Sequence, residues 1–399
     1  MRLVPVVCCV LIVLAGCQGL PAQNDTPTTA PATAGSTPST AQTPAQTSTS
    51  EPTTERTREI NVEGGTLPYG VNTVWTRVES MLGVDVGAPL TVRIENISAD
   101  GTPRVPRFQR LLGVQPAPAV GPAGRTLQPG NIVKVDTAML DTPTRLEYTL
   151  AHEYTHVVQF RTNTYNKLGR ALDTASRDGY SVYWALVEGS ATYVARQYER
   201  QYTTSTPRNL GQWYRNGSTT AKISVAPTYF GWRYLNATTE SPEGLQRVYE
   251  NPPRTTEELI HALPPDSEPP ADLSVSVETD RQNQTTKRLG ELHLRALLGT
   301  AVNESVAARA ADGWGNDRRV AIGSGNETDY AWVHRWDDAA NATEFEQGVN
   351  DYLAARGGLN ASVRVSRVAP ETTVLFVGSE AFVADVTASG TNETVTVRA

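Results

Sequence analysis

The chain has 399 residues and carries 35 Lys and Arg against 42 Asp and Glu, which gives a formal net charge of −7. Lysine occurs only at positions 134, 167, 222 and 287, and no basic block is present. This charge pattern argues against nucleic acid as a partner. All three cysteines lie within the first 17 residues, so no disulfide is expected in the folded part.

The first 16 residues have the features of a secretory signal. After Arg2 an apolar run extends to Leu14, and the run ends at Leu14-Ala15-Gly16-Cys17. It is too short to span a membrane. Because these four residues resemble a lipobox, we expect Cys17 to carry a lipid that anchors an extracytoplasmic protein to the cell membrane. Signal cleavage without a lipid is the alternative.

Residues 17–58 are expected to form a disordered tether, because they are rich in Thr, Ser, Pro and Ala and lack apolar periodicity. The remaining residues suffice for one domain over 59–279 and a second over 280–399. The acidic, lysine-poor composition is typical of an archaeal cell-surface protein. Asn-x-Ser/Thr triplets suit an exported glycoprotein, and they begin at Asn96, Asn216, Asn236, Asn283, Asn303, Asn326, Asn341, Asn360 and Asn392.

The region after the tether begins with alternating helix and strand patterns. Apolar residues on one side predict a helix over 72–82, and alternation predicts a strand over 90–94. Residues 103–130 contain several Pro and Gly and are predicted to be largely loop. Alternation over 131–136 predicts a second strand.

A helix predicted to begin at Thr142-Pro143 contains the sequence His152-Glu153-Tyr154-Thr155-His156. Four residues make about one helical turn, so both imidazoles project from the same face and can bind one metal ion. Glu153 lies beside them, where a carboxylate can reach water on that metal. This HExxH pattern serves zinc-assisted hydrolysis. Two incidental surface histidines on a helix are the alternative interpretation.

A second helix, predicted over residues 181–200, contains Glu188 in a mostly apolar run. A buried carboxylate needs a cation or solvent, so Glu188 is either a third metal ligand or a residue on the exposed helix face. The neighbouring Gly189 favours the ligand, because a helical glycine costs about 1 kcal/mol relative to alanine. That cost is easier to explain if another helix approaches closely there.

HExxH followed 32 residues after His156 by Glu188-Gly189-Ser190-Ala191 resembles the gluzincins, the thermolysin-like zinc metallopeptidases. The resemblance implies an α+β fold with a thermolysin-like zincin catalytic domain, followed here by a smaller α+β part. It implies one Zn²⁺ per chain on His152, His156 and Glu188. It also implies that a substrate peptide pairs with an edge strand, assigned here to Asn131, Ile132 and Val133.

Two departures from the family pattern affect the expected activity. Thr192 stands four residues after Glu188, where thermolysin-type enzymes have an Asp that orients a histidine. The Gly-x-Met-x-Asn signature with which aminopeptidases hold a free amino terminus is absent. We therefore expect an endopeptidase that acts on peptides or proteins.

In the expected mechanism, zinc lowers the pKa of a water towards about 7, and Glu153 is the general base. The oxyanion requires a second donor, for which the candidates are Tyr229, Tyr234 and His261. We favour Tyr229, although a tyrosine in an aromatic cluster is more often part of a core. His261 and His293 are by default interpreted as structural.

Residues 280–399 predict a separate α+β part. The pattern indicates helices over 289–298 and 340–353, a strand over 330–336, and four short strands between 362 and 397. No catalytic triad, metal spacing or phosphate loop occurs there. A cover for the cleft or a module that binds a partner is the expected role.

Two rival hypotheses remain open. In the first, the protein is an inactive peptidase-fold surface lipoprotein that acts as a binding module. In the second, it is a zinc hydrolase that cleaves a non-peptide bond. The sequence determines neither the natural substrate nor the oligomeric state.

Overall fold

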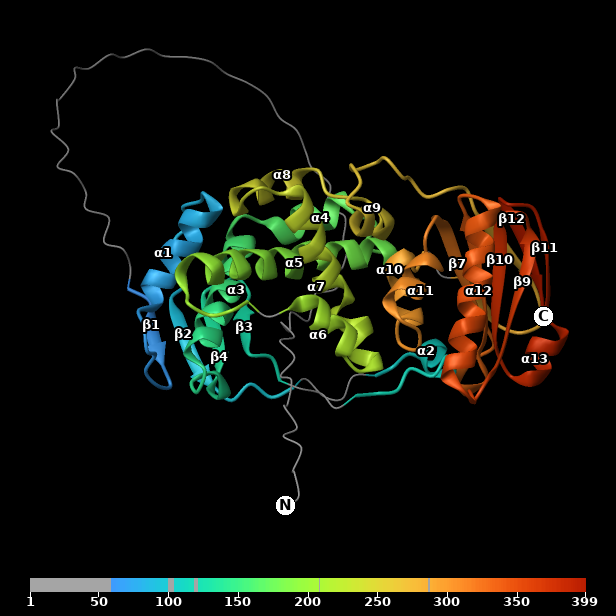
Figure 1. Cartoon of the computed structure of the whole chain (residues 1–399), viewed down its shortest axis with the longest axis horizontal. Helices are drawn as coiled ribbons and strands as arrows, with labels where there is room; N and C mark the ends of the chain where they lie inside the picture. Colours follow the sequence, from blue (N-terminus) through green and yellow to red (C-terminus); the bar gives the residue numbers. More distant parts are fainter. Residues whose placement is uncertain (1–58, 100–103, 118–120, 208, 286–287) are drawn as a thin grey trace, which may run out of the picture.

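The computed structural model describes residues 59–99, 104–117, 121–207, 209–285 and 288–399. The molecule is elongated, with a small sheet at one end, a helical middle and a larger sheet near the other end (Figure 1). The predicted signal peptide, the predicted lipidation site Cys17 and the predicted tether all lie outside the described residues. Within those residues, none of the helices combines the length and the apolar character needed to cross a bilayer.

The first sheet has four strands in the order β1-β2-β4-β3, and its first three strands are parallel. The predicted strands over 90–94 and 131–136 correspond to β2 and β4, and the predicted helix over 72–82 corresponds to α1. The elements of this region are β1 (Asn61–Glu63), α1 (Val71–Leu82), β2 (Thr91–Glu95), α2 (Arg107–Leu111), β3 (Gly124–Leu127) and β4 (Ile132–Asp136).

One expectation about this sheet is wrong. The segment predicted to be largely loop is mostly irregular among its described residues, but it also contains α2 and β3, and β3 pairs antiparallel with β4. As a result β4 is hydrogen-bonded to β2 on one side and to β3 on the other. Asn131, Ile132 and Val133 therefore do not form the open edge of the sheet, and β3 takes that place.

The middle of the molecule is helical. As predicted, Pro143 occupies the first turn of α3, although the preceding Thr142 makes no side-chain capping bond. The predicted helix over 181–200 is the longer α5, which Ser176 caps by accepting a bond from the Gly179 amide. The helices here are α3 (Pro143–Arg161), α4 (Thr164–Ala171), α5 (Arg177–Tyr202), α6 (Leu210–Asn216), α7 (Thr219–Thr238), α8 (Leu245–Glu250) and α9 (Thr256–His261).

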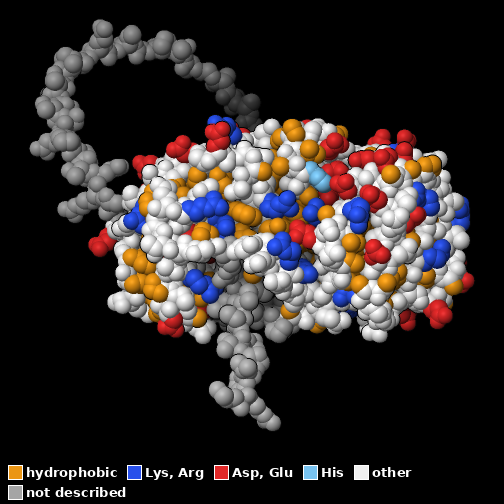
Figure 2. Space-filling view, in the orientation of Figure 1, with side chains coloured by type: hydrophobic (Ala, Val, Ile, Leu, Met, Phe, Trp, Pro, Cys, Tyr) orange, Lys and Arg blue, Asp and Glu red, His pale blue; other side chains and the backbone are white. Residues whose placement is uncertain are grey.

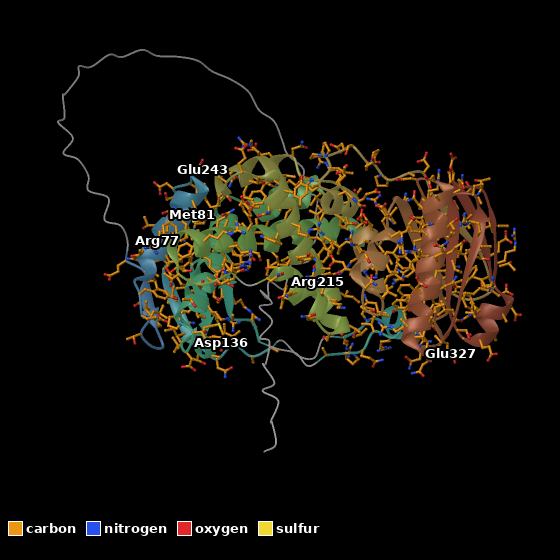
Figure 3. The ribbon with its side chains drawn as sticks, viewed as in Figure 1. Arg77, Met81, Asp136, Arg215, Glu243 and Glu327 are labelled. Atoms are coloured by element: carbon orange, nitrogen blue, oxygen red, sulfur yellow. The ribbon has the colours of Figure 1, made fainter. Side chains whose placement is uncertain are left out.

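Polar and aromatic contacts attach α1 to the helical middle. Arg77 of α1, labelled in Figure 3, forms an ion pair of 3.3 Å with Glu147 of α3. Its guanidinium also lies 4.5 Å from the ring centroid of Tyr202 on α5. On the buried side, the rings of Trp75 and Tyr154 meet edge to face at 5.4 Å. These contacts fix the first sheet and α1 relative to α3.

The C-terminal part contains two further sheets, with strand orders β6-β7-β8-β10-β9 and β11-β12-β5. All predicted helices and strands of this part occur, and β6, α11, β7 and α13 are present in addition. The elements are β5 (Ser274–Glu278), β6 (Asn283–Thr285), α10 (Glu291–Leu298), α11 (Glu304–Arg309), β7 (Trp314–Ile322), β8 (Asp329–Trp336), α12 (Ala339–Arg356), β9 (Ser362–Ala369), β10 (Thr372–Gly378), α13 (Glu380–Asp385), β11 (Thr387–Gly390) and β12 (Thr394–Arg398).

The larger hydrophobic core extends from Ile60 to Val377 and includes buried residues on both sides of position 280. A second, smaller core between the two C-terminal sheets contains Val320, Phe376 and Val395. The molecule is therefore an α+β protein whose C-terminal elements share buried surface with the helical middle.

Two glycines allow α5 and α7 to cross very closely. A Cβ placed on Gly189 would lie 2.6 Å from the carbonyl carbon of Gly231. A Cβ placed on Gly231 would lie 1.9 Å from the carbonyl oxygen of Ala185. The close helix approach predicted at Gly189 is thus confirmed, and the approaching helix is α7.

The Gly231→Ala substitution should destabilise the protein, because the added methyl group would meet backbone that cannot move aside. We expect a loss of roughly 1–3 kcal/mol in the free energy of unfolding, measured by denaturant titration. The matched control is Gly169→Ala in the exposed part of α4, where a Cβ would have no neighbour within 4 Å. That control should gain about 0.5–1 kcal/mol. Equal effects of the two substitutions would contradict the close crossing.

Candidate metal centre

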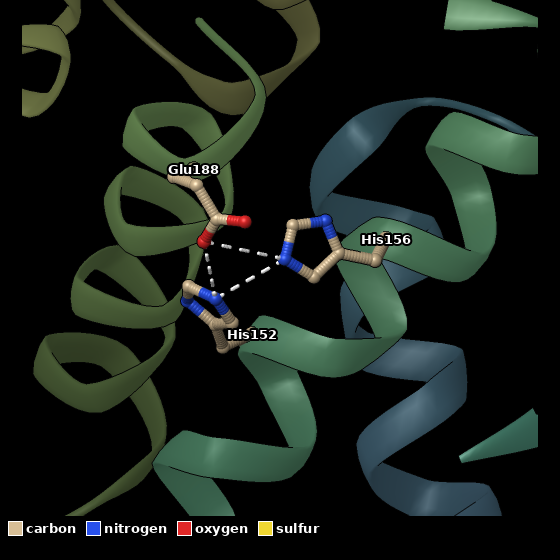
Figure 4. A group of neighbouring side chains, drawn as sticks. All are labelled: His152, His156 and Glu188. Atoms are coloured by element: carbon tan, nitrogen blue, oxygen red, sulfur yellow. Dashed lines mark hydrogen bonds and ion pairs between the residues drawn. The ribbon is translucent and has the colours of Figure 1, made fainter. Parts of the chain in front are cut away.

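Three side chains from α3 and α5 converge in the interior of the molecule (Figure 4). The Nε2 atoms of His152 and His156 lie 3.2 Å apart. The Oε2 atom of Glu188 lies 3.5 Å from Nε2 of His152 and 3.7 Å from Nε2 of His156. All three residues are buried. Because their lone-pair atoms face a common point, these residues could hold a metal ion.

The electrostatics of this group also indicate a place for a cation. Burial alone would lower the pKa of His156, but the carboxylate of Glu188 outweighs it and raises this pKa to about 9. Burial would raise the pKa of Glu188, but the two histidines lower it to about 2. In the metal-free protein, a proton on His156 therefore balances the buried charge of Glu188.

A hydrogen-bond network fixes the orientation of His156. The Nε2 atom of Gln159 donates to the carbonyl of Val187 at 3.0 Å and to the hydroxyl of Ser190 at 2.8 Å. Since a carbonyl can only accept, the amide orientation of Gln159 is defined, and its Oε1 faces Nδ1 of His156 at 2.7 Å. The Nδ1 atom must then carry the ring proton, which leaves the Nε2 lone pair of neutral His156 directed at the metal position.

Thr192 stands where thermolysin-type enzymes have an Asp that orients a histidine. The network described above can orient one of the two histidines without that Asp. Gln159 performs for His156 the task of fixing the tautomer, and Tyr165 provides a further hydroxyl 3.2 Å from the same Nδ1. The Nδ1 atom of His152 is buried and has no hydrogen-bond partner among the described residues. Sequence reasoning missed Gln159, although a buried amide one helical turn beyond His156 was a usable signal.

The side chain of Glu153 extends from α3 to the edge strand β3. Its Oε2 atom accepts a hydrogen bond of 2.8 Å from the hydroxyl of Thr126. Its Oε1 atom is buried without a hydrogen-bond partner among the described residues. A Cβ on Gly124 would lie only 2.9 Å from that Oε1 atom. Thr126 was missed because the segment that contains it was predicted to be loop.

The other predicted site residues have different surroundings. Tyr229 lines the same cavity as His152 and Glu188. Its ring stacks on Tyr214 at 4.7 Å, and burial raises the pKa of its hydroxyl. Tyr234 and His261 are not part of the cavity lining, and Nε2 of His261 instead lies 3.1 Å from Oε2 of Glu291. The structure thus brings only Tyr229 of these three candidates to the site.

The cavity beside the three converging side chains has a volume of about 240 Å³. Its wall combines aromatic and charged groups, and Tyr148 on α3 is a hydroxyl-bearing residue there that sequence reasoning did not select. The described lining residues are Thr144, Arg145, Tyr148, Thr149, His152, Glu188, Thr192, Arg196, Glu199, Ser205, Thr206, Leu210, Trp213, Thr228 and Tyr229. The cavity has the composition of a pocket for a side chain or a short segment of a ligand.

The fold and the site together define an α+β protein with a buried His-His-Glu group in its helical middle. A family model with the description "Domain of unknown function (DUF8575)" matches residues 277–399. The converging residues lie outside that match. No curated protein matches the chain, and no solved structure matches it.

Metal affinity should depend on Gln159. We expect Gln159→Leu to weaken the binding of a divalent metal ion about 10- to 100-fold, because the substitution removes the acceptor that holds the His156 ring. Competition with a chromophoric chelator would measure the affinity. Gln197→Leu on α5, at a position outside the network around His156, is the matched control and should bind the metal ion as the wild type does. Unchanged affinity in Gln159→Leu would contradict the role of the network.

Metal affinity should also fall with pH. Below about pH 9, the metal-free protein holds a proton on His156 that must leave before metal binds. The affinity should therefore decrease by up to about tenfold for each unit of falling pH. Chelator competition at several pH values between 6 and 8.5, corrected for the chelator's own protonation, would measure this dependence. A flat profile would contradict it.

Proposed function

We propose that the protein is a zinc metallopeptidase of the gluzincin type, with His152, His156 and Glu188 as the zinc ligands. The observation that carries this proposal is the spacing of the three ligand atoms. In a tetrahedral site with zinc–ligand bonds of about 2.0–2.1 Å, two ligand atoms lie about 3.3 Å apart. The separations of 3.2, 3.5 and 3.7 Å fit that arrangement.

The donor set supports zinc over the hard cations. Two imidazole nitrogens and one carboxylate are ligands of catalytic zinc sites, whereas magnesium and calcium prefer oxygen ligands alone. Three protein ligands leave a fourth position open. When bound there, zinc acts as a Lewis acid towards a carbonyl and lowers the pKa of a water towards about 7.

Glu153 is the proposed general base. Its Oε1 atom is unpaired and can take a proton, while Thr126 holds Oε2 and so fixes the orientation of the carboxylate. The same Oε1 atom can then deliver the proton to the leaving amine. A buried carboxylate oxygen without a partner is costly to maintain. A catalytic task for Glu153 explains that cost, whereas a binding module does not require it.

The open edge of β3 is the proposed place for the substrate backbone. β3 is at the end of the sheet, and its residues Gly124 and Thr126 lie against Glu153. An extended peptide added to this edge would therefore pass next to the general base. The arrangement of edge strand, HExxH helix and Glu-bearing helix is the one that a thermolysin-like fold requires. Tyr229 is the proposed second donor to the oxyanion.

The proposed setting is the outer side of a cell membrane. It rests on the signal-like residues 1–16 and on the lipobox that ends at Cys17. With these features, the protein is a lipid-anchored endopeptidase that acts on extracytoplasmic peptides or proteins.

The Glu153→Gln substitution tests the proposal. We expect this variant to fold and to keep about one zinc per chain, because the amide and the carboxylate are nearly isosteric. Hydrolysis of quenched peptides or casein should fall on the order of 100-fold or more, since the general base is lost. Elemental analysis would measure zinc, and a fluorescence assay with and without chelator would measure cleavage.

Glu147→Gln on the same helix is the control, because the carboxylate of Glu147 is paired with Arg77 and Tyr198 and has no contact with β3 among the described residues. It should cleave at close to the wild-type rate. If the wild type binds zinc but cleaves no peptide, the result supports the binding-module hypothesis and contradicts the peptidase proposal. If Glu153→Gln cleaves as fast as the wild type, Glu153 is not the base.

A further inference from the structure

A second cavity is bordered by four arginines, and none of the three proposed zinc ligands is among its described lining residues. It has a volume of about 520 Å³. The described lining residues come from α2, α5, α7, α10 and β7 and from the segments before them: Arg104, Val105, Pro106, Gln109, Ala175, Arg177, Thr220, Ile223, Ser224, Arg288, Leu289, His293 and Arg319. This set contains four arginines and one histidine but no Asp or Glu.

The positive charge of this cavity does not follow from the overall composition of the chain. The chain has a net charge of −7, so an acid-free cavity with four guanidinium groups is unlike the protein as a whole. In Figure 2, Lys and Arg side chains gather over the central, helical part of the molecule. Like charges that converge on one cavity repel each other unless an anion joins them.

Carboxylates neutralise only part of this cluster. Arg288 lies 3.4 Å from Asp173 and 3.5 Å from Asp178. No ion pair with a carboxylate is found for Arg104 or Arg177 among the described residues. The guanidinium of Arg177 instead lies 5.6 Å from the ring centroid of Tyr180.

The buried histidine of the cavity independently indicates that a ligand binds here. His293 is 6% exposed, and its Nε2 atom has no hydrogen-bond partner among the described residues. Burial, followed by the charges of Arg177 and Arg319, lowers the pKa of His293 to about 3. The ring is therefore neutral at ordinary pH, and it has a buried nitrogen that can donate its proton to a ligand oxygen.

We propose that this cavity binds an oxyanion of the phosphate or sulfate class, either free or as the ester of a small organic molecule. Guanidinium groups pair with such anions through parallel N–H bonds, and several of them can serve one tetrahedral anion. The hydroxyl of Ser224 and the amide of Gln109 add neutral polar groups to the wall. The cavity is larger than one inorganic anion, so it also has space for the organic group of an ester.

The site joins two parts of the chain. Arg104 and Arg177 belong to the part that holds the HExxH helix, whereas Arg288, His293 and Arg319 belong to the part matched by the family model. A bound oxyanion would therefore strengthen the contact between the C-terminal part and the helical middle. This consequence does not depend on peptidase activity.

Thermal unfolding and calorimetry on the full mature chain would test the proposal. At constant ionic strength, inorganic phosphate or sulfate should raise the melting temperature above its value in chloride, and calorimetry should show saturable binding. A comparison of inorganic phosphate with glycerol phosphate at equal concentration distinguishes the two sources. Tighter binding of glycerol phosphate would assign the site to an ester, and equal or weaker binding would assign it to the free anion.

Substitutions of arginines in the cavity lining test whether phosphate binds at this cavity. Arg177→Gln should weaken phosphate binding at least tenfold, and Arg104→Gln should weaken it as well without a cost in folding, since Arg104 is exposed and makes no ion pair among the described residues. Arg309→Gln, at an exposed position on α11, is the control and should bind as the wild type does. If phosphate and sulfate stabilise no more than chloride, or if the Arg104 variant binds with wild-type affinity, the proposal is wrong.

Discussion

The carboxylate of Glu188 is buried against two imidazoles, and the position of α5 relative to α3 depends on this contact. A buried carboxylate is tolerated only if a positive charge lies close to it. In the metal-free protein that charge is a proton, which accounts for the raised pKa of His156 and the lowered pKa of Glu188. A divalent cation would satisfy the same requirement, so the fold needs a cation at this point whether or not it carries out catalysis.

The surrounding structure holds this contact in place from several directions. Gly189 and Gly231 bring the backbone of α7 close against α5. Gln159 links the ring of His156 to the backbone of α5 and, through Ser190, to Tyr249 on α8. Because the amide orientation is set by a carbonyl acceptor, the network determines which nitrogen keeps its proton when His156 is neutral. The ligand set is therefore held by packing and hydrogen bonds before any metal binds.

The C-terminal part is packed onto this framework and has its own buried charges. Asp317 on β7 accepts hydrogen bonds from the indole nitrogens of Trp314 and Trp332 and from the amides of Leu289 and Gly290. These bonds connect the sheet to the start of α10, which lies beside the arginine-lined cavity. Polar contacts thus hold α10 to the sheet, and the larger core joins the C-terminal part to the helical middle.

The sequence alone determined the elements with strong local patterns. The HExxH spacing, the apolar run around Glu188 and the glycine beside it predicted two helices and the three side chains that meet between them, since one helical turn places residues four apart on one face. Most helices and strands of the C-terminal part were also predicted from local patterns, the helices from apolar residues on one face and the strands from alternation. Only the tertiary structure showed that β3 is the edge strand, because a four-residue strand has no periodicity and exists through its pairing with β4. The partners of Glu153 and Gln159 also lie 27 to 31 residues away in the chain. Contacts over such separations depend on how helices and strands pack, and no local pattern encodes them.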